Sequence, residues 1–382
     1  MKIFTRTMLS IFLIINGLYA SDVIKLHTLG KPALQWVVTD GQPLYVSSPE
    51  SFQNMIGERV GPLYMDGSVL TMKLSPNAAY RVISLLQPMD QVKDGKRFSD
   101  FYVYDSNDEL LYTTSKGTGA DLKAHVAAVS DNGILALVDP VNAVVSFYSK
   151  GDMLSESQLY QTEGDHSLER NAFVDWVGDR CYVLIERPGQ GGMQAKNAIM
   201  ISIDPEGRDQ VTSILPFTYI LDHVFDPGQY FVSGYSYNPS TKQFSPLVMS
   251  VDATGKALWT NENFGHELAL SQNGSYLAAR KSHDGVVVFN LKLSRVEEVE
   301  FARQGKAALG LSIDNAGQIG LIRVPNDFFV KKNSHHAEVY FPRSGASVGV
   351  QLDPALPQMF KLHSDGYRFL LGTQYEWLEI RE

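Results

Sequence analysis

Histidines recur at a fixed distance from a turn that repeats along the chain. His125 and His266 each stand five positions before the serine of that turn, and a third copy of the turn follows the pair Asp222-His223. Neutral imidazole and carboxylate groups are common metal ligands, and imidazole exchanges protons near neutral pH. The spacing therefore identifies these four residues as candidates for ligand binding, with His125 and His266 as the candidate metal ligands.

Cationic side chains occupy the corresponding place in two other copies. Arg170 and Lys306 stand there, and Glu267 and Asp121 lie close by in sequence. If these residues line the mouth of a central channel, a ring of His, Asp, Arg and Lys side chains could bind an anionic ligand. The alternative is a solvated polar rim that binds no ligand. We assign no catalytic residue.

The repeated turn, here called the first-type turn, has the form apolar–(Ser/Asp)–x–(Asn/Asp)–Gly and precedes a short apolar strand. Successive copies lie roughly 43 to 55 residues apart, which is the length of four short strands with their turns. The copies are Leu74–Ala78, Val129–Gly133, Phe225–Gly228, Leu270–Gly274 and Leu362–Gly366, with weaker ones at Asp175–Gly178 and Ile313–Gly317.

A second kind of turn, the hairpin turn, alternates with the first. Its Asp, Asn and Gly residues supply the local hydrogen bonds and positive φ angles that tight turns need. Each unit therefore runs strand, first-type turn, strand, loop, strand, hairpin turn, strand, which is one four-stranded antiparallel blade. The copies are Asp105–Asp108, Ser149–Asp152, Asp204–Gly207, Asp252–Gly255 and Pro342–Gly345.

These patterns predict an all-β chain. We expect a single β-propeller of about seven four-stranded antiparallel blades, with six or eight as alternatives. The chain stops one strand short of a complete last blade, whereas surplus strands at Gln35–Val38 and Leu44–Val46 precede the first full unit. An N-terminal strand that pairs with the last blade would close the ring and remove exposed sheet edges. Short turns of helix are expected only at Ser48–Met55 and Glu156–Tyr160.

Two units resemble known propeller families. Leu270–Ala278 is similar to the Ser-Pro-Asp-Gly-x-x-Leu-Ala turn of WD-like and translocation-protein-like propellers, and Val251–Trp259 resembles the Asp-x-x-Thr-Gly-Lys-x-x-Trp hairpin of quinoprotein-like propellers. Each resemblance covers about one unit well, so it implies the fold and not the function. The dipeptides of WD repeats do not recur, the quinoprotein tryptophan appears only as Trp259, and an adjacent cysteine pair is missing. We therefore expect no cofactor.

The first 20 residues have the layout of a secretory signal peptide, and residues 21–382 are assigned to the propeller domain. Lys2 and Arg6 precede the apolar stretch Met8–Ile15, and Ala20 precedes the proposed cleavage site. The apolar stretch is too short for a spanning helix. We expect an exported protein, periplasmic or secreted, with no membrane span after removal of the signal peptide.

Composition excludes one class of partner and one kind of crosslink. The 382 residues carry a formal net charge of −9, whereas a nucleic-acid-binding protein normally shows a basic surplus. Cys181 is the single cysteine, so an internal disulfide is impossible. We expect Cys181 to be a buried strand residue.

Other motifs do not carry chemistry. His335-His336 with Glu338 is interpreted as a polar loop, because adjacent strand residues point to opposite faces.

Two functions from different classes are favoured, and a cofactor-bearing redox propeller is a third alternative. The first is an exported, non-enzymatic propeller that binds a protein, peptide or glycan partner, and it predicts an exposed aromatic or apolar patch. The second is a channel-site enzyme, a metal-dependent lactonase-like hydrolase or a lyase, built on His125, Asp222, His223 and His266. It predicts that histidines and carboxylates converge within coordination distance.

Overall fold

The computed structural model describes most of the chain, and every regular element within it is a β-strand. This confirms the prediction of an all-β protein. The signal peptide predicted for residues 1–20 lies outside the described residues, and no described helix has the length and hydropathy needed to cross a membrane. The described residues are 22–28, 35–39, 42–48, 51–54, 68–77, 79–87, 95–107, 109–119, 125–161, 171–187, 196–226, 229–262, 267–271, 273–281, 284–302, 304–326, 328, 336–351, 359–362, 368–372 and 376–381.

The chain divides into two compact units. The central unit comprises Val37–Thr39 and Pro43–Gly265, and the terminal unit combines Met1–Trp36, Asp40–Gln42 and His266–Glu382. The assignment of residues 21–382 to one domain stays a prediction.

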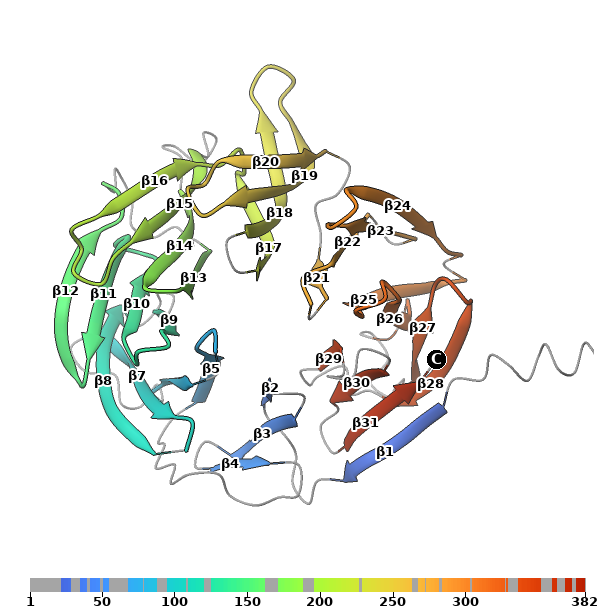
Figure 1. The fold of residues 1–382 in the computed structure, drawn as a ribbon, viewed down its shortest axis with the longest axis horizontal. Coiled ribbons are helices and arrows are strands. Elements are labelled where there is room, and N and C mark those ends of the chain that lie inside the picture. Colours follow the sequence, from blue (N-terminus) through green and yellow to red (C-terminus); the bar gives the residue numbers. More distant parts are fainter. Residues whose placement is uncertain are drawn as a thin grey trace, which may run out of the picture. The chain divides into compact units, whose positions relative to one another are not determined.

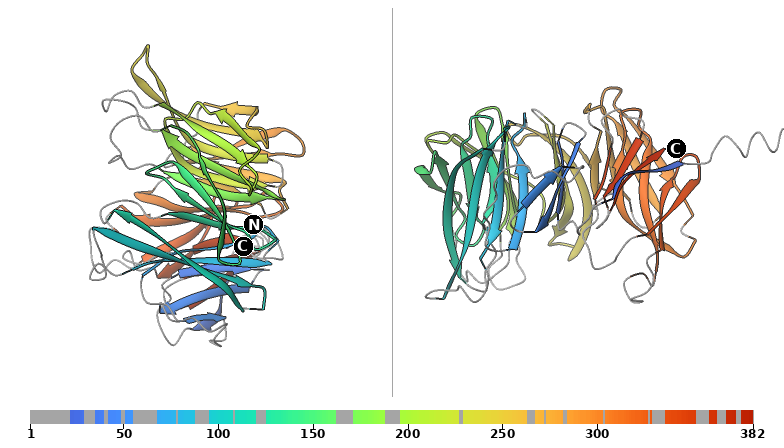
Figure 2. Two further views of the ribbon diagram at one scale, coloured as in Figure 1. Left: turned by 90° about the vertical axis from the view of Figure 1, so that its left-hand side faces the viewer. Right: turned by 90° about the horizontal axis from the view of Figure 1, so that it is seen from below.

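The central unit contains four antiparallel sheets, each made of four strands in sequence order (Figure 1). Figure 2 shows the same twisted sheets from two other directions. The first two sheets are β5 (Ser68–Leu74), β6 (Tyr80–Leu86), β7 (Lys96–Asp105), β8 (Leu110–Gly119), and β9 (Val126–Val129), β10 (Leu135–Asp139), β11 (Val144–Ser149), β12 (Asp152–Gln158). The other two are β13 (Ala172–Val177), β14 (Arg180–Arg187), β15 (Lys196–Ile203), β16 (Gln210–Ile214), and β17 (Tyr219–Asp226), β18 (Gln229–Asn238), β19 (Gln243–Asp252), β20 (Ala257–Asn261).

Within the terminal unit, the N-terminal strand completes the last sheet. β1 (Asp22–Thr28) pairs antiparallel with β31 (Glu376–Arg381), and β30 (Arg368–Gly372) and β29 (Met359–Leu362) continue that sheet. The sequence predicted such pairing without indicating which strand would make it. The other two sheets are β21 (Leu268–Leu270), β22 (Tyr276–Arg280), β23 (Gly285–Asn290), β24 (Arg295–Glu300), and β25 (Lys306–Ile313), β26 (Ile319–Pro325), β27 (His336–Phe341), β28 (Ala346–Gln351).

A further sheet has three strands, β2 (Gln35–Thr39), β3 (Gln42–Ser48) and β4 (Ser51–Asn54). The described residues thus form seven four-stranded sheets and one three-stranded sheet. The strand order within a repeat is the predicted one. The number of blades in a closed ring stays a prediction.

The repeated turns are held by the short side chains that made them recognisable in the sequence. Ser271 Oγ accepts hydrogen bonds from the backbone N–H groups of Ser275 at 3.1 Å and Tyr276 at 2.9 Å. Asp252 Oδ1 does the same in a hairpin turn, where it accepts from Thr254 N at 2.8 Å and Lys256 N at 3.0 Å. These bonds satisfy backbone groups that neither strand can pair.

First-type turns of neighbouring sheets also bond to each other. The N–H of Asn77 donates to Asp131 Oδ1 at 2.8 Å, and the N–H of Asn273 donates to Asn315 Oδ1 at 2.9 Å. The same two turn positions are used in both units. The repeated polar residues therefore join neighbouring sheets as well as shaping each turn.

The core lies between facing sheets. Apolar side chains from adjacent sheets interdigitate there, as in the edge-to-face contact of Phe147 with Trp176 at a centroid distance of 5.9 Å. Cys181 is fully buried in this layer, as predicted, and burial raises the pKa of its thiol. Burial of these layers drives the formation of each sheet pair.

Two local predictions are wrong. The stretch Glu156–Tyr160, expected as a turn of helix, begins within β12, and the stretch Ser48–Met55 contains β4. In both, pairing with a neighbouring strand overrides a weak local preference for helix.

Candidate functional site

The structure describes four of the six candidate ligand-binding residues. His125 lies directly before β9, and Asp222 and His223 lie on β17, all in the central unit. Lys306 opens β25 in the terminal unit. Arg170 and His266 lie outside the described residues. Whether these residues share a ligand stays a prediction.

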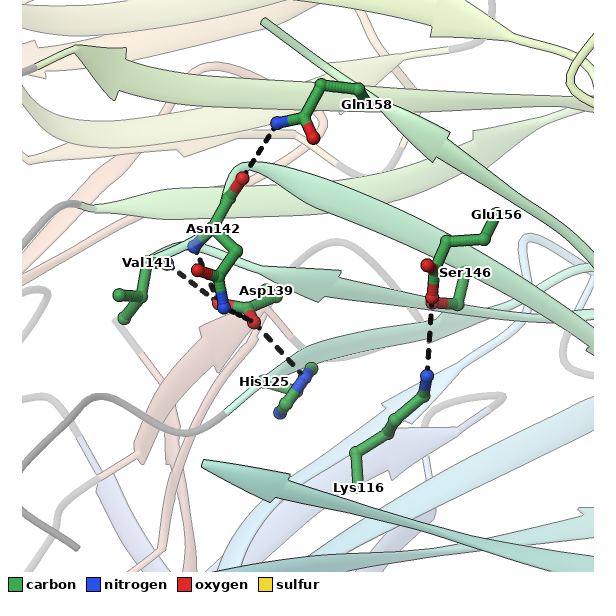
Figure 3. Close-up of polar contacts among 8 residues, drawn as sticks. All are labelled: Lys116, His125, Asp139, Val141, Asn142, Ser146, Glu156 and Gln158. Carbon is green, nitrogen blue, oxygen red and sulfur yellow. Dashed lines mark hydrogen bonds and ion pairs between the residues drawn. The ribbon is translucent and has the colours of Figure 1, made fainter. Parts of the chain in front are cut away.

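His125 is buried within the central unit, and Figure 3 shows it next to Asp139. Its side chain is 6% exposed, and its ring meets Phe101 edge-on at a centroid distance of 6.4 Å. Its nearest carboxylate partner is Asp139, whose Oδ2 lies 3.8 Å from Nε2, beyond hydrogen-bonding distance.

Asp139 is already occupied by its own turn (Figure 3). Oδ1 accepts from the N–H groups of Val141 at 2.8 Å and Asn142 at 3.0 Å, and Oδ2 accepts from the Asn142 amide at 2.7 Å. Burial lowers the pKa of His125, although Asp139 acts in the opposite direction. Burial therefore favours the neutral form of the ring, which packs against Phe101.

A second polar contact in the same region joins two outer strands (Figure 3). Lys116 of β8 lies 3.4 Å from Glu156 Oε2 of β12, and Ser146 Oγ donates to the same oxygen at 2.9 Å. This pair connects adjacent sheets near the surface, where an ion pair contributes little to stability.

His223 belongs to a three-residue cluster on inner strands. Its Nε2 lies 3.2 Å from Asp175 Oδ2, and Lys73 contacts Asp175 Oδ1 and the carbonyl of Val174. Lys73 is on β5 and Asp175 on β13, and both strands lie against β9, so the contact passes the intervening strand. The cluster connects three sheets of the central unit through one carboxylate.

The ring of His223 is enclosed as well. Phe173 lies 4.3 Å and Phe225 4.9 Å from it between centroids, and its Nδ1 is buried without a partner among the described residues. One ring nitrogen therefore faces Asp175 and the other faces the interior. Asp222 accepts the backbone N–H of His223 at 2.8 Å, so it shapes the strand locally.

A cavity of about 400 Å³ adjoins this cluster. Lys73, Asp175, Trp176 and Phe225 contribute to its wall, together with Asp131 of the neighbouring first-type turn. The site combines one ion pair with aromatic and aliphatic walls. This cavity suits an uncharged ligand or one that forms hydrogen bonds better than it suits a metal ion. Both carboxylate oxygens of Asp175 are already bound, one by Lys73 and the other by His223.

In the terminal unit, Lys306 is part of an ion-pair cluster. Its Nζ lies 2.6 Å from Glu338 Oε2, and Arg323 Nε donates to Oε1 at 2.6 Å. Burial alone would raise the pKa of Glu338, but hydrogen bonds from Lys306 and Arg323 hold it below its ordinary value.

Glu338 thus pairs with Lys306 and Arg323, while His336 is exposed at the start of β27. His335 lies outside the described residues. Within the described ranges, no group of three or more His, Cys, Asp or Glu side chains is placed to hold a metal.

The sequence reasoning missed an aromatic surface on the sheet β17–β20. Tyr219 and Phe244 are in contact and are 49% and 50% exposed, and Leu221, two positions along β17 from Tyr219, is 45% exposed. β18 and β19 are ten residues long, whereas β20 has five. The alternation Tyr235-Ser236-Tyr237 followed by Asn238-Pro239 was the available signal, since it marks a long hairpin with an aromatic face.

Comparison with known proteins identifies the fold. No family model matches the chain, and no curated protein matches it in sequence. Among 1175 matching chains of solved structures, BamB from Moraxella catarrhalis aligns over 94% of this chain and 98% of its own, with a TM-score of 0.57 and 11% sequence identity. Such a likeness, shared with so many chains, identifies a fold that hosts many functions. The chain is a β-propeller-like repeat protein.

Proposed function

We propose that this protein is an exported, non-enzymatic β-propeller that acts as a binding platform for a protein, peptide or glycan partner. The signal-peptide pattern of residues 1–20 supports export, to the periplasm or the cell exterior. The likeness to BamB supports the scaffold and leaves the partner open.

The observation that carries this proposal is the exposed aromatic pair of Tyr219 and Phe244, with Leu221 exposed two positions further along β17. Large apolar side chains that gather in solvent are costly unless something covers them. Interfaces between proteins are enriched in tyrosine and phenylalanine. The surface therefore meets the expectation for a platform.

The finer architecture belongs to the same proposal. We take the sheets as the blades of one ring, which the pairing of β1 with β31 closes. The repeated turns indicate about seven blades, and the number is eight if the three-stranded sheet is also a blade. Deletion of Asp22–Thr28 should then lower the unfolding temperature, because β31 loses one of its two strand partners and becomes an exposed edge. An unchanged unfolding temperature would contradict closure by β1.

A second candidate is the channel-site enzyme, which one observation favours. The hydrogen bond of His223 to Asp175 borders a cavity, and a histidine oriented by a carboxylate is a common arrangement for proton transfer. The burial of Nδ1 stands against it, because a substrate could not reach that nitrogen. Elemental analysis by mass spectrometry decides the metal-dependent form. A stoichiometric metal that is lost in the His223→Ala and His266→Ala variants would favour the enzyme.

Site-specific photo-crosslinking in living cells tests the platform. A photoreactive amino acid replaces Leu221 in one variant and Ile214 in the control, since Ile214 is 66% exposed on β16 of the neighbouring sheet. We expect a discrete crosslinked product from position 221 and none from position 214. The absence of any product from position 221, or equal products from both, would contradict the proposal.

A further inference from the structure

The hairpin of β18 and β19 extends past the rest of its sheet (Figures 1 and 2). β17 pairs with β18 only up to Tyr235, and β20 pairs with β19 only from Val248. The pairs from Ser236↔Ser245 to Asn238↔Gln243 therefore form a two-stranded ribbon. A ribbon of two strands buries little apolar surface, so it adds little to folding stability. A contact with a partner would give it a role.

One face of this ribbon carries a row of aromatic rings. Tyr237 and Phe244 are directly opposite each other, and Tyr219 is opposite Tyr235 two positions along, so their side chains share a face. Phe244 is the middle ring, 5.6 Å from Tyr219 and 5.0 Å from Tyr237 between centroids. The rings are tilted by 42° and 45° to their neighbours. They form wedges and not one flat stacking plane.

The edges of the ribbon are poor templates for an added strand. On the β18 side, the carbonyl of Tyr235 accepts from Thr218 N at 2.7 Å, and the N–H of Tyr237 donates to Thr218 Oγ1 at 3.2 Å. At the base of the ribbon on the β19 side, Pro246 has no N–H to donate. A partner that adds as a β-strand would find few free backbone donors. The aromatic face, and not an edge, is therefore the surface that remains for a partner.

The charge of the surface fits a neutral partner. From Tyr235 to Leu247, Lys242 is the only charged residue, and the remainder is Ser, Thr, Asn, Gln, Pro, Leu and aromatic residues. The faces of aromatic rings carry partial negative charge. They attract the C–H groups beside a proline nitrogen, which carry partial positive charge. The electrostatics thus match an uncharged, proline-rich chain.

We propose that the β18–β19 ribbon binds a proline-rich segment of a partner protein in the polyproline II conformation. This helix has three residues per turn, makes no internal hydrogen bonds and offers ridges of prolyl rings. Ridges enter wedges between aromatic rings, which is how aromatic-lined surfaces recognise such segments. Hydroxyl and amide groups on the ribbon donate to the solvated carbonyls of the segment. The inference rests on the proposed platform function and names its partner class.

Fluorescence anisotropy tests this with the full mature chain. The probe is a labelled oligoproline of about ten residues, which is already in the required helix. The control is a Gly/Ser peptide of the same length, which is flexible. We expect binding of the oligoproline and none of the control. No binding of oligoproline, or equal binding of both peptides, overturns the proposal.

Variants place the interaction on the ribbon. Phe244→Ala removes the middle ring and should weaken oligoproline binding by about tenfold or more. Tyr237→Phe keeps the ring and should weaken it only a few-fold. Ile214→Ala is the matched control and should leave binding unchanged, with circular dichroism confirming that each variant is folded. Equal effects of Phe244→Ala and Ile214→Ala overturn the proposal.

The outcome also separates this inference from the platform function. If oligoproline fails to bind but position 221 still crosslinks a partner, the platform stands and the polyproline assignment falls. Binding of a neutral oligosaccharide in place of oligoproline has the same meaning. If both oligoproline binding and crosslinking fail, the platform function falls as well.

Discussion

The inner-strand cluster of Lys73, Asp175 and His223 and the aromatic row of the β18–β19 ribbon use their side chains in opposite ways. In the cluster, polar groups bond to one another and connect three sheets. In the ribbon, half-exposed aromatic rings contact one another within a single sheet and join no second sheet. The ionisable side chains of the cluster thus stabilise the fold, whereas the β18–β19 hairpin has exposed side chains that a partner could contact.

The largest expected effect comes from the shared carboxylate. Asp175→Asn keeps the shape of the side chain but leaves Lys73 without its ion-pair partner and weakens the bond to His223. We expect the free energy of unfolding to fall by about 2 kcal/mol, since hydrogen bonds to charged groups are worth about 1.5–3 kcal/mol. Urea denaturation measures it. A change below about 0.5 kcal/mol, the range of an ordinary surface substitution, would show that the cluster does not stabilise the fold.

His125 should make stability depend on pH. Its folded pKa is lowered from the ordinary 6.5 by burial, so the folded state favours the neutral ring. The contribution of His125 to the free energy of unfolding is then fully present above the pKa of the unfolded state. It is lost as the pH falls through the lower pKa of the folded state. Asp139, Lys116 and Glu156 are the charged groups that act on the ring.

Denaturation between about pH 8 and pH 5 tests this prediction. The difference in free energy of unfolding between wild type and His125→Phe should shift against the wild type as the pH falls, because phenylalanine does not titrate. A difference that does not change with pH would mean that the His125 ring is equally well solvated in the folded and the unfolded state.

The hairpin turns should contribute less. Asp252→Ala removes the acceptor of the N–H groups of Thr254 and Lys256, and we expect a loss of about 1 kcal/mol. The hydrogen bond from Thr254 holds the pKa of Asp252 below its ordinary value, so its contribution is lost only in acid. Asp252→Asn, which keeps the acceptor oxygen, is the control. Equal losses in both variants would assign the effect to charge.

The smallest effect on stability is expected in the ribbon. Phe244→Ala removes a half-exposed ring from a segment outside the core, so the free energy of unfolding should change by less than about 0.5 kcal/mol. Thermal unfolding checks it against wild type. A loss as large as that of Asp175→Asn would mean that the aromatic row supports the fold.

The sequence predicted what local chemistry determines. The Ser, Asp, Asn and Gly residues of the two turns act through short-range hydrogen bonds, so their spacing predicted the strand order and the four-stranded sheets. It did not reveal that Asn77 and Asp131, far apart in sequence, bond across neighbouring sheets.

The candidate site was harder to predict, because alignment on a turn gives position along a strand and not the side-chain environment. His125 and His223 fall near equivalent places, yet one packs against Phe101 and the other bonds to Asp175. The packing that decides their roles comes from other sheets. The ribbon was missed because the exposure of Phe244 depends on where β17 and β20 stop pairing.

The most direct test of this contrast is one oligoproline titration of the Phe244→Ala and Asp175→Asn variants at a temperature where both are folded. We expect Phe244→Ala to bind oligoproline about tenfold or more weakly and Asp175→Asn to bind it like wild type. The reverse pattern, with binding lost in Asp175→Asn and kept in Phe244→Ala, would contradict it and move the functional site to the inner strands.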